Sequence, residues 1–257
     1  MTRLNRHCRL IQLVMGYHFE KCVYIWNQSS EIMIDDNFIM NHSLLECLRE
    51  FKGASTGNSV QEREDSLKEP FTLLAKKILY GGYFAVGDSN KEEAYKVEID
   101  SIEFYYHEEE NYNQKYRILD PIVYHKNTSN NKNQKEAFQI GTLNAHVSGI
   151  DITFEDQVDA RYRASALIRT FTVFKDGQEI KKEEHPTRMY DYLFMEIPLP
   201  ELRIKWVKKT IDKQCTLYTG KRINVYQYDE NGKKLDGKKG REKKPDERAW
   251  RFSKDPL

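Results

Sequence analysis

The sequence has few cysteines, and they are scattered along the chain. The four residues Cys8, Cys22, Cys47 and Cys215 form no C-x-x-C pair. This spacing does not predict a zinc ribbon or a thioredoxin-type site, and four cysteines are too few to hold 257 residues together as a disulfide scaffold. A reducing compartment, the cytoplasm, is therefore expected for this protein.

Long apolar runs are also missing. No run approaches the roughly 18 apolar residues that a membrane-spanning helix needs, so we expect no membrane partner. The short apolar stretch at residues 10–15 is not followed by a small-residue cleavage site, which is a poor fit to a signal peptide. We interpret residues 1–39 as an N-terminal appendage outside the core, and residues 40–257 as the folded domain.

Neither sign of charge is in excess over the whole chain, which carries 41 Lys and Arg against 40 Asp and Glu. This near-neutrality argues against a surface that binds polyanions everywhere. The charge is nevertheless split, because residues 202–257 hold 17 basic and 8 acidic residues, a net charge of +9. Such a basic region indicates a nucleic-acid surface or a solvated tail, and composition alone favours the tail.

The common cofactor and catalytic motifs are absent as well. The sequence contains no G-x-S-x-G, no Walker loop and no G-x-G-x-x-G. The spacings of His107, His125, His146 and His185 are irregular, without the i, i+4 pairs that bind zinc on a helix. We therefore predict neither a metal nor a cofactor.

Hydrophobic spacing predicts two helices near the start of the domain. Residues 42–51 have apolar positions at helical spacing, and residues 70–79 form a second helix that starts at Pro70 and ends at Gly81-Gly82. Residues 52–68 are polar and are predicted as a loop. Residues 187–194 have helical spacing again.

The remaining segments favour strands, at residues 83–86, 95–106, 150–154, 165–174 and 223–228. The Lys- and Gly-rich residues 232–248 are predicted as a mobile basic loop. Together these segments predict a single α+β domain with a curved, mostly antiparallel sheet flanked by helices.

Glu103 is the first candidate for chemistry. Alternate strand residues share a face, so Glu103 follows Val97, Ile99 and Ser101 inward, together with Tyr105. A carboxylate in that position loses hydration, which raises its pKa unless a cation is near, and this is the profile of a general acid or base. The alternative is a Glu at a strand end that pairs with a surface Lys.

Arg169 raises a similar question, because it lies inside the apolar strand at residues 165–174. A guanidinium there needs a carboxylate, a phosphate or a route to water, and Glu103 is a candidate partner. The alternative is a side chain whose stem lies on the sheet and whose head reaches solvent. Aromatic residues near both positions suit a stacked purine or pyrimidine, although core packing accounts for such rings in most proteins.

Seven short motifs lie in order at residues 74–79, 99–105, 120–125, 141–146, 165–169, 186–189 and 250–252. Their order resembles that of the methylpurine-DNA glycosylase family, also called alkyladenine or 3-methyladenine DNA glycosylases. The resemblance covers about residues 70–254 and implies the fold of that family.

The resemblance also implies an activity, which is excision of damaged purines from DNA by N-glycosidic hydrolysis, as in base excision repair. Glu103 would activate water, Tyr105 and His146 would stack on the base, His125 would shape the pocket, and Arg169 would face the DNA. The enzyme would be a metal-independent, monofunctional glycosylase, a monomer, cytoplasmic and nucleoid-associated when it acts on DNA. In such a fold the C-terminal strands belong to the domain, which favours a nucleic-acid surface formed by Lys205, Lys208, Lys209, Lys221 and Arg222.

The sequence departs from the family pattern at three places. Ser148 stands where the family has a Tyr that wedges between base pairs, so the DNA is expected to be single-stranded or damaged and flexible. Glu155 falls near the position of the family's base-reading Asn. Residues 108–110 add three Glu beside the expected entrance of the base-binding pocket. Two alternatives therefore stay open, a nucleic-acid-binding module without catalysis and a hydrolase of a small nucleoside-type N-glycoside.

Overall fold

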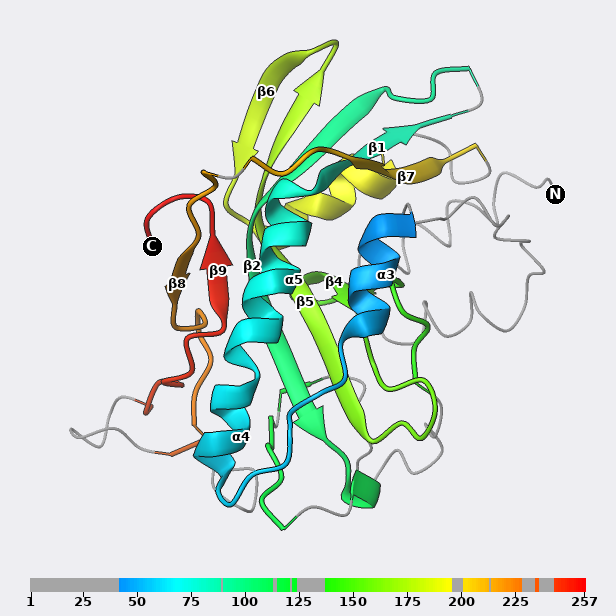
Figure 1. Ribbon diagram of the computed structural model, residues 1–257. Helices are drawn as coiled ribbons and strands as arrows, with labels where there is room; N and C mark the ends of the chain where they lie inside the picture. The colour runs from blue at the N-terminus through cyan, green and yellow to red at the C-terminus, as the bar shows by residue number, and fades with distance from the viewer. Residues whose placement is uncertain are drawn as a thin grey trace, which may run out of the picture.

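The computed structural model describes residues 42–88, 90–112, 115–120, 122–123, 137–195, 201–212, 214–227, 234–235 and 243–257 (Figure 1). The predicted appendage at residues 1–39 and the predicted pocket residue His125 lie outside the described residues. No helix in the described part of the chain is long and apolar enough to cross a membrane.

One curled antiparallel sheet dominates the fold. Its main strand order is β3-β4-β5-β2-β1-β7, with β6 paired to β5, β9 paired to β2, and β8 paired to β9. The strands are β1 (Gly82–Gly87), β2 (Tyr95–Glu108), β3 (Leu143–His146), β4 (Gly149–Thr153), β5 (Tyr162–Lys175), β6 (Gln178–Glu183), β7 (Arg203–Lys208), β8 (Tyr218–Gly220) and β9 (Arg251–Ser253). The prediction of a single α+β domain with a mostly antiparallel sheet is confirmed.

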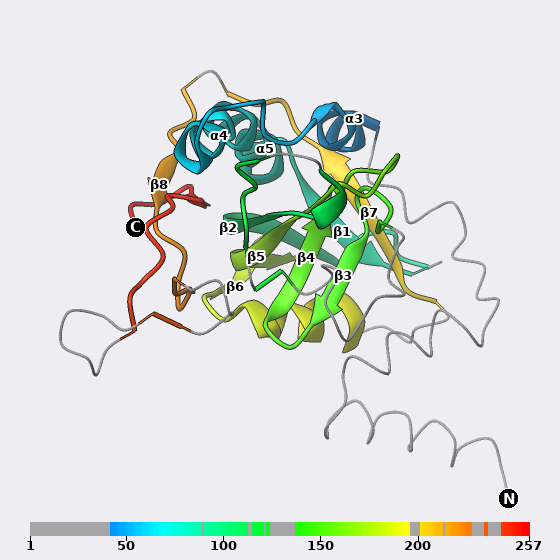
Figure 2. The ribbon, with the colours of Figure 1, turned by 90° about the horizontal axis from the view of Figure 1, so that it is seen from below.

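Three helices cover one face of the sheet: α3 (His42–Glu50), α4 (Val60–Ser66) and α5 (Lys68–Tyr80) (Figure 2). The short helices η2 (Pro186–Arg188) and η3 (Asp191–Met195) lie on the other side of the sheet in this view, and η1 spans Glu110–Tyr112. The helical spacing at residues 187–194 thus forms one 3-10 and one π segment rather than a single α-helix.

The two helices predicted near the start of the domain are confirmed as α3 and α5. Phe71 from α5 stacks on Phe104 from β2, with the ring centroids 4.4 Å apart, so Ile102, Phe104 and Tyr106 face the helices. Because neighbouring strand residues alternate sides, Glu103 and Tyr105 point to the opposite face. The side chains that pack against α5 therefore lie on the face opposite Glu103, whereas Val97 and Ile99 are buried on its own face.

Two sequence predictions about local structure need correction. The polar segment 52–68 contains α4, because the Ser59 hydroxyl accepts a hydrogen bond from the Glu62 N–H (3.1 Å) and caps the helix. Residues 223–227 of the strand predicted at residues 223–228 instead contain a turn and one isolated bridge between Tyr226 and Pro245, and residue 228 lies outside the described residues. The first backbone donor of this segment, the Ile223 N–H, bonds a side chain and not a neighbouring strand.

The segment predicted as a mobile basic loop lies partly outside the described residues. Within the described part, the Leu235 N–H donates to Gln227 and the Asp246 N–H donates to Val225. The Asp246 side chain is only 3% exposed. The end of this segment is therefore packed against the domain at Asp246, while the mobility of the loop stays a prediction.

Candidate active site around Glu103

Glu103 occupies the centre of three strands. It pairs with Leu167 of β5 on one side and with Arg251 of β9 on the other, and Leu167 in turn pairs with Asp151 of β4. Residues that pair directly across a sheet project from the same face. Glu103, Arg251, Leu167 and Asp151 therefore form a row on the face opposite α5.

The Glu103 carboxylate is fully buried and held at both oxygens. Oε1 accepts a hydrogen bond from the Ile223 N–H (2.6 Å), and Oε2 accepts one from the Tyr105 hydroxyl (2.9 Å). The Arg169 Nε lies 3.7 Å from Oε1, which makes an ion pair without a short hydrogen bond. The predicted Glu103–Arg169 contact is present, and the alternative of a Glu paired with a surface Lys is wrong.

Tyr105 is fixed by the same carboxylate and by a cation. Its hydroxyl donates to Glu103, and the Arg222 guanidinium lies 4.8 Å from its ring centroid. Burial and the nearby Glu103 charge raise the pKa of the Tyr105 hydroxyl well above its usual range, so this hydroxyl stays protonated and able to donate. One ring face is thus covered by Arg222.

His146 belongs to a polar chain on the same face of the sheet. Its Nε2 lies 3.0 Å from Asp151 Oδ1, the other Asp151 oxygen accepts from the Ser165 hydroxyl (2.9 Å), and Nδ1 accepts from the Ser148 N–H (3.3 Å). The histidine is 8% exposed. Sequence reasoning assigned His146 as a stacking ring and missed Asp151, although Asp between Ile150 and Ile152 was a visible signal of a polar group on one strand face.

The β3–β4 hairpin that carries His146 depends on a glycine. Gly149 has φ of 141°, and a Cβ on it would lie 3.0 Å from both Leu167 and Pro186. The Tyr190 hydroxyl donates to the carbonyl groups of His146 and Gly149. This hairpin is therefore fixed tightly against η2 and the Leu167 row.

Arg222 is not on an exposed surface, which corrects one predicted nucleic-acid contact. Its side chain is fully buried and ion-paired with Asp120 and Asp246, and its Nη1 also donates to the Phe104 carbonyl (3.3 Å). Burial alone would lower the pKa of this guanidinium, but the charges of Asp120 and Asp246 outweigh burial and raise it. Arg222 thus holds the following turn against β2. This turn contains the Ile223 N–H that bonds Glu103.

The four remaining predicted contact residues do not form one continuous surface. Lys205 and Lys208 are on β7, Lys209 comes directly after β7, and Lys221 follows β8. In both views β7 lies at the right of the molecule and β8 at the left (Figures 1 and 2). Three of these lysines meet carboxylates: Lys205 with Glu92, Lys209 with Glu98, and Lys221 with Glu247. Lys208 is exposed.

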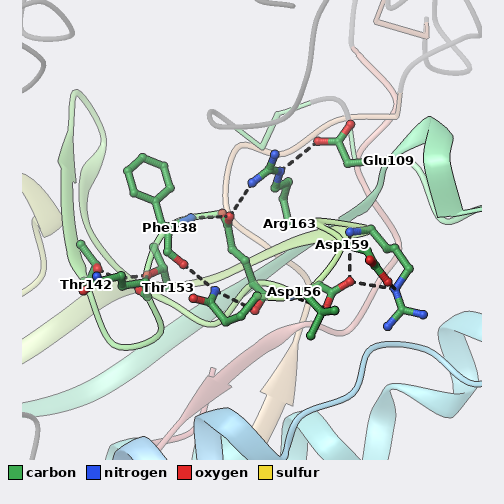
Figure 3. Close-up of polar contacts among 12 residues, drawn as sticks. Glu109, Phe138, Thr142, Thr153, Asp156, Asp159 and Arg163 are labelled. Carbon is green, nitrogen blue, oxygen red and sulfur yellow. Dashed lines mark hydrogen bonds and ion pairs between the residues drawn. The ribbon is translucent and has the colours of Figure 1, made fainter. Parts of the chain in front are cut away.

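The extra acidic residues are neutralised inside the domain. Glu109 accepts from Arg163 Nε (3.1 Å), and Glu155 accepts from Arg163 Nη1 (2.8 Å) and from the Phe138 N–H (2.9 Å) (Figure 3). Glu108 is buried against Arg63 in the same manner. Of the three Glu expected beside the pocket entrance, Glu108 and Glu109 are therefore buried in ion pairs, whereas Glu110 is exposed.

Buried tyrosines predict how stability depends on pH. Burial, reinforced by Glu103 and Glu108, raises the pKa values of Tyr105 and Tyr106, while an unfolded tyrosine ionises near pH 10. Above that pH the folded state keeps protons that the unfolded state loses, so each such tyrosine lowers the unfolding free energy by about 1.4 kcal/mol per pH unit.

The measurement is urea unfolding between pH 9 and 11.5. Tyr106→Phe is expected to reduce the decrease in unfolding free energy by the contribution of one tyrosine. Tyr218→Phe, which alters an exposed ring, is expected to leave the decrease unchanged. Equal slopes for wild type and Tyr106→Phe would show that Tyr106 ionises normally in the folded protein.

No protein-family model, no curated protein and no solved structure matches this chain. The resemblance to methylpurine-DNA glycosylases therefore stays a prediction. Among the described residues, no group of three or more His, Cys, Asp or Glu side chains is arranged to hold a metal ion.

Proposed function

We propose that this protein is a DNA glycosylase-like hydrolase that excises alkylated purines by cleaving the N-glycosidic bond. The observation that carries the proposal is the fully buried Glu103 carboxylate, fixed by the Ile223 N–H and the Tyr105 hydroxyl on the sheet face opposite α5. A carboxylate held in one geometry suits a general base and also stabilises a developing positive charge.

The proposed step uses the free acceptor positions of Glu103. A carboxylate has about four lone-pair sites, and two are occupied by Ile223 and Tyr105, so one oxygen can still accept a proton from water. The water oxygen bonds to the sugar carbon, its proton passes to Glu103, and the cationic alkylated purine leaves with the bonding electrons as a neutral base. The oxocarbenium-like transition state is stabilised by the Glu103 charge.

The other predicted site residues keep proposed roles around this carboxylate. A target base stacks on Tyr105, on the ring face that Arg222 does not cover, and lies near His146. His125 shapes the pocket from a segment outside the described residues. Arg169 holds positive charge beside Glu103.

The hairpin tip supports an unpaired substrate. Ser148 and the 70% exposed Val147 form the turn between β3 and β4, and neither side chain is large enough to fill the space of an extruded base. Single-stranded or locally melted DNA does not require this wedge, because its bases are already unpaired.

A second candidate, hydrolysis of a small nucleoside-type N-glycoside, is favoured by one observation. Lys205, Lys209, Lys221 and Arg222 all face carboxylates, so fewer cations are available for a DNA backbone than the sequence predicts. The same Glu103 geometry serves either substrate.

The test measures free base released from alkylated single-stranded DNA, alkylated duplex DNA and an alkylated nucleoside, each at several salt concentrations. We expect release from single-stranded DNA, with apparent affinity falling steeply as salt rises. Release from the nucleoside alone, without salt dependence, would favour the second candidate. If none of the three substrates yields free base, the hydrolase proposal is wrong.

A further inference from the structure

Two arginines flank Glu103 from the strands on either side. Arg251 pairs directly with Glu103 from β9, and Arg169 comes from β5, at the point where the β2–β5 register is irregular next to Thr170. The Arg169 side chain is 16% exposed, and Arg251 is also partly buried. Two positive charges thus meet one buried negative charge, on a partly accessible face.

Glu103, Arg169 and Arg251 together have more hydrogen-bond donors than the neighbouring acceptors of the chain satisfy. Glu103 already accepts the Ile223 N–H and the Tyr105 hydroxyl, and its ion-pair distance to Arg169 Nε is 3.7 Å. The Nε atoms of Arg169 and Arg251 are both buried and donate to no protein group. A buried donor without a partner costs free energy, so an acceptor from outside the chain would relieve it.

Nearby carboxylates do not fill this need. Asp151 is engaged with His146 and Ser165, while Asp120 and Asp246 are engaged with Arg222. Burial lowers the pKa of the Arg251 guanidinium, the Glu103 charge opposes this, and the Arg169 charge adds to it. An anion that contacts both guanidinium groups would offset this repulsion between Arg169 and Arg251.

We infer that Arg169 and Arg251 form a binding site for a phosphoryl group beside Glu103. Guanidinium groups match phosphate oxygens with paired N–H donors, and two of them supply both the charge and the geometry for one phosphate. The role of this site in holding the substrate rests on the proposed function, whereas phosphoryl binding itself can be measured without any reaction. A free nucleoside has no such group, so the site favours a nucleotide or a polynucleotide substrate.

The test follows the Nε–H signals of Arg169 and Arg251 in the full chain by nitrogen-edited NMR during titration with methyl phosphate, dimethyl phosphate and acetate. We expect both signals to shift together with methyl phosphate or dimethyl phosphate. Tighter binding of dimethyl phosphate identifies a diester of the DNA backbone, and tighter binding of methyl phosphate identifies the terminal phosphate of a nucleotide. Acetate is expected to bind more weakly than either.

The variants Arg251→Gln and Arg169→Gln are each expected to weaken phosphate ester binding about tenfold or more, because each removes charge-assisted hydrogen bonds. Arg203→Gln changes an exposed arginine on β7 and serves as the matched control with unchanged binding. The inference is overturned if neither ester shifts the two signals, if acetate binds as well as the esters, or if the Arg251→Gln and Arg169→Gln variants bind as tightly as wild type. A wild-type protein that binds neither ester but still releases free base would refute this site and leave the proposed function standing.

Discussion

Replacing Glu103 by Gln is expected to slow base release by about 10²–10⁴-fold, the usual contribution of a positioned general base. Gln keeps an oxygen that can accept the Ile223 N–H, but it cannot take a proton from water and carries no charge to stabilise the transition state. Because the effect falls on the chemical step, single-turnover release of base under saturating protein is the measurement that isolates it.

The matched control is Glu98→Gln on the same strand. Glu98 lies five residues before Glu103, and its carboxylate meets Lys96, Lys209 and Lys254 away from the site face. Its replacement is expected to leave the rate of base release unchanged. A Glu103→Gln variant that folds normally and works as fast as wild type would contradict the catalytic assignment, whichever substrate is used.

Replacing Arg222 by Met is expected to destabilise the domain by about 3–5 kcal/mol. The reason is that Asp120 and Asp246 are buried and would keep their negative charges without their main cation. Burial alone would raise the pKa of Asp120, but the attraction of Arg222, with help from Arg248, lowers it below the usual range. Without Arg222 that attraction is lost, and urea unfolding at neutral pH measures the cost.

Lys221→Met is the neighbouring control for the Arg222 variant. Lys221 pairs with Glu247, and both side chains are more than half exposed, so the loss of this pair is expected to cost less than about 1 kcal/mol. If the two variants unfold at the same urea concentration, the buried network does not hold the C-terminal segment as described. The double variant Asp120→Asn with Arg222→Met is expected to recover part of the stability, because one unpaired charge is then removed.

The sequence was informative wherever a local pattern decides the structure. Helical spacing and the Gly81-Gly82 stop predicted α5, and period-two alternation predicted the buried position of Glu103 on β2. From the sequence, Glu103 was only a candidate partner of Arg169, because residue spacing within one strand does not show which residues of another strand lie beside it.

Errors arose where side chains compete with the backbone for hydrogen bonds. The segment after Arg222 is rich in strand-forming residues, yet its Ile223 N–H donates to Glu103 and not to a strand partner. The composition of residues 52–68 suggests a loop, yet Ser59 and Glu62 are a helix cap. Basic residues were the least predictable, because whether Arg222 is solvated or buried depends on Asp120, 102 positions earlier in the chain.

The sequence alone determined the α+β class, the antiparallel sheet and a carboxylate on a buried strand, because each follows from residue spacing within a single segment. Only the tertiary structure decided what surrounds that carboxylate. Tyr105 is on the same strand as Glu103, whereas pairing of β2 with β5 and β9 brings Arg169 and Arg251 to the carboxylate, and the turn after β8 brings the Ile223 N–H. Charge placement likewise became clear only in three dimensions, since burial turned an expected DNA contact, Arg222, into an internal support of the site.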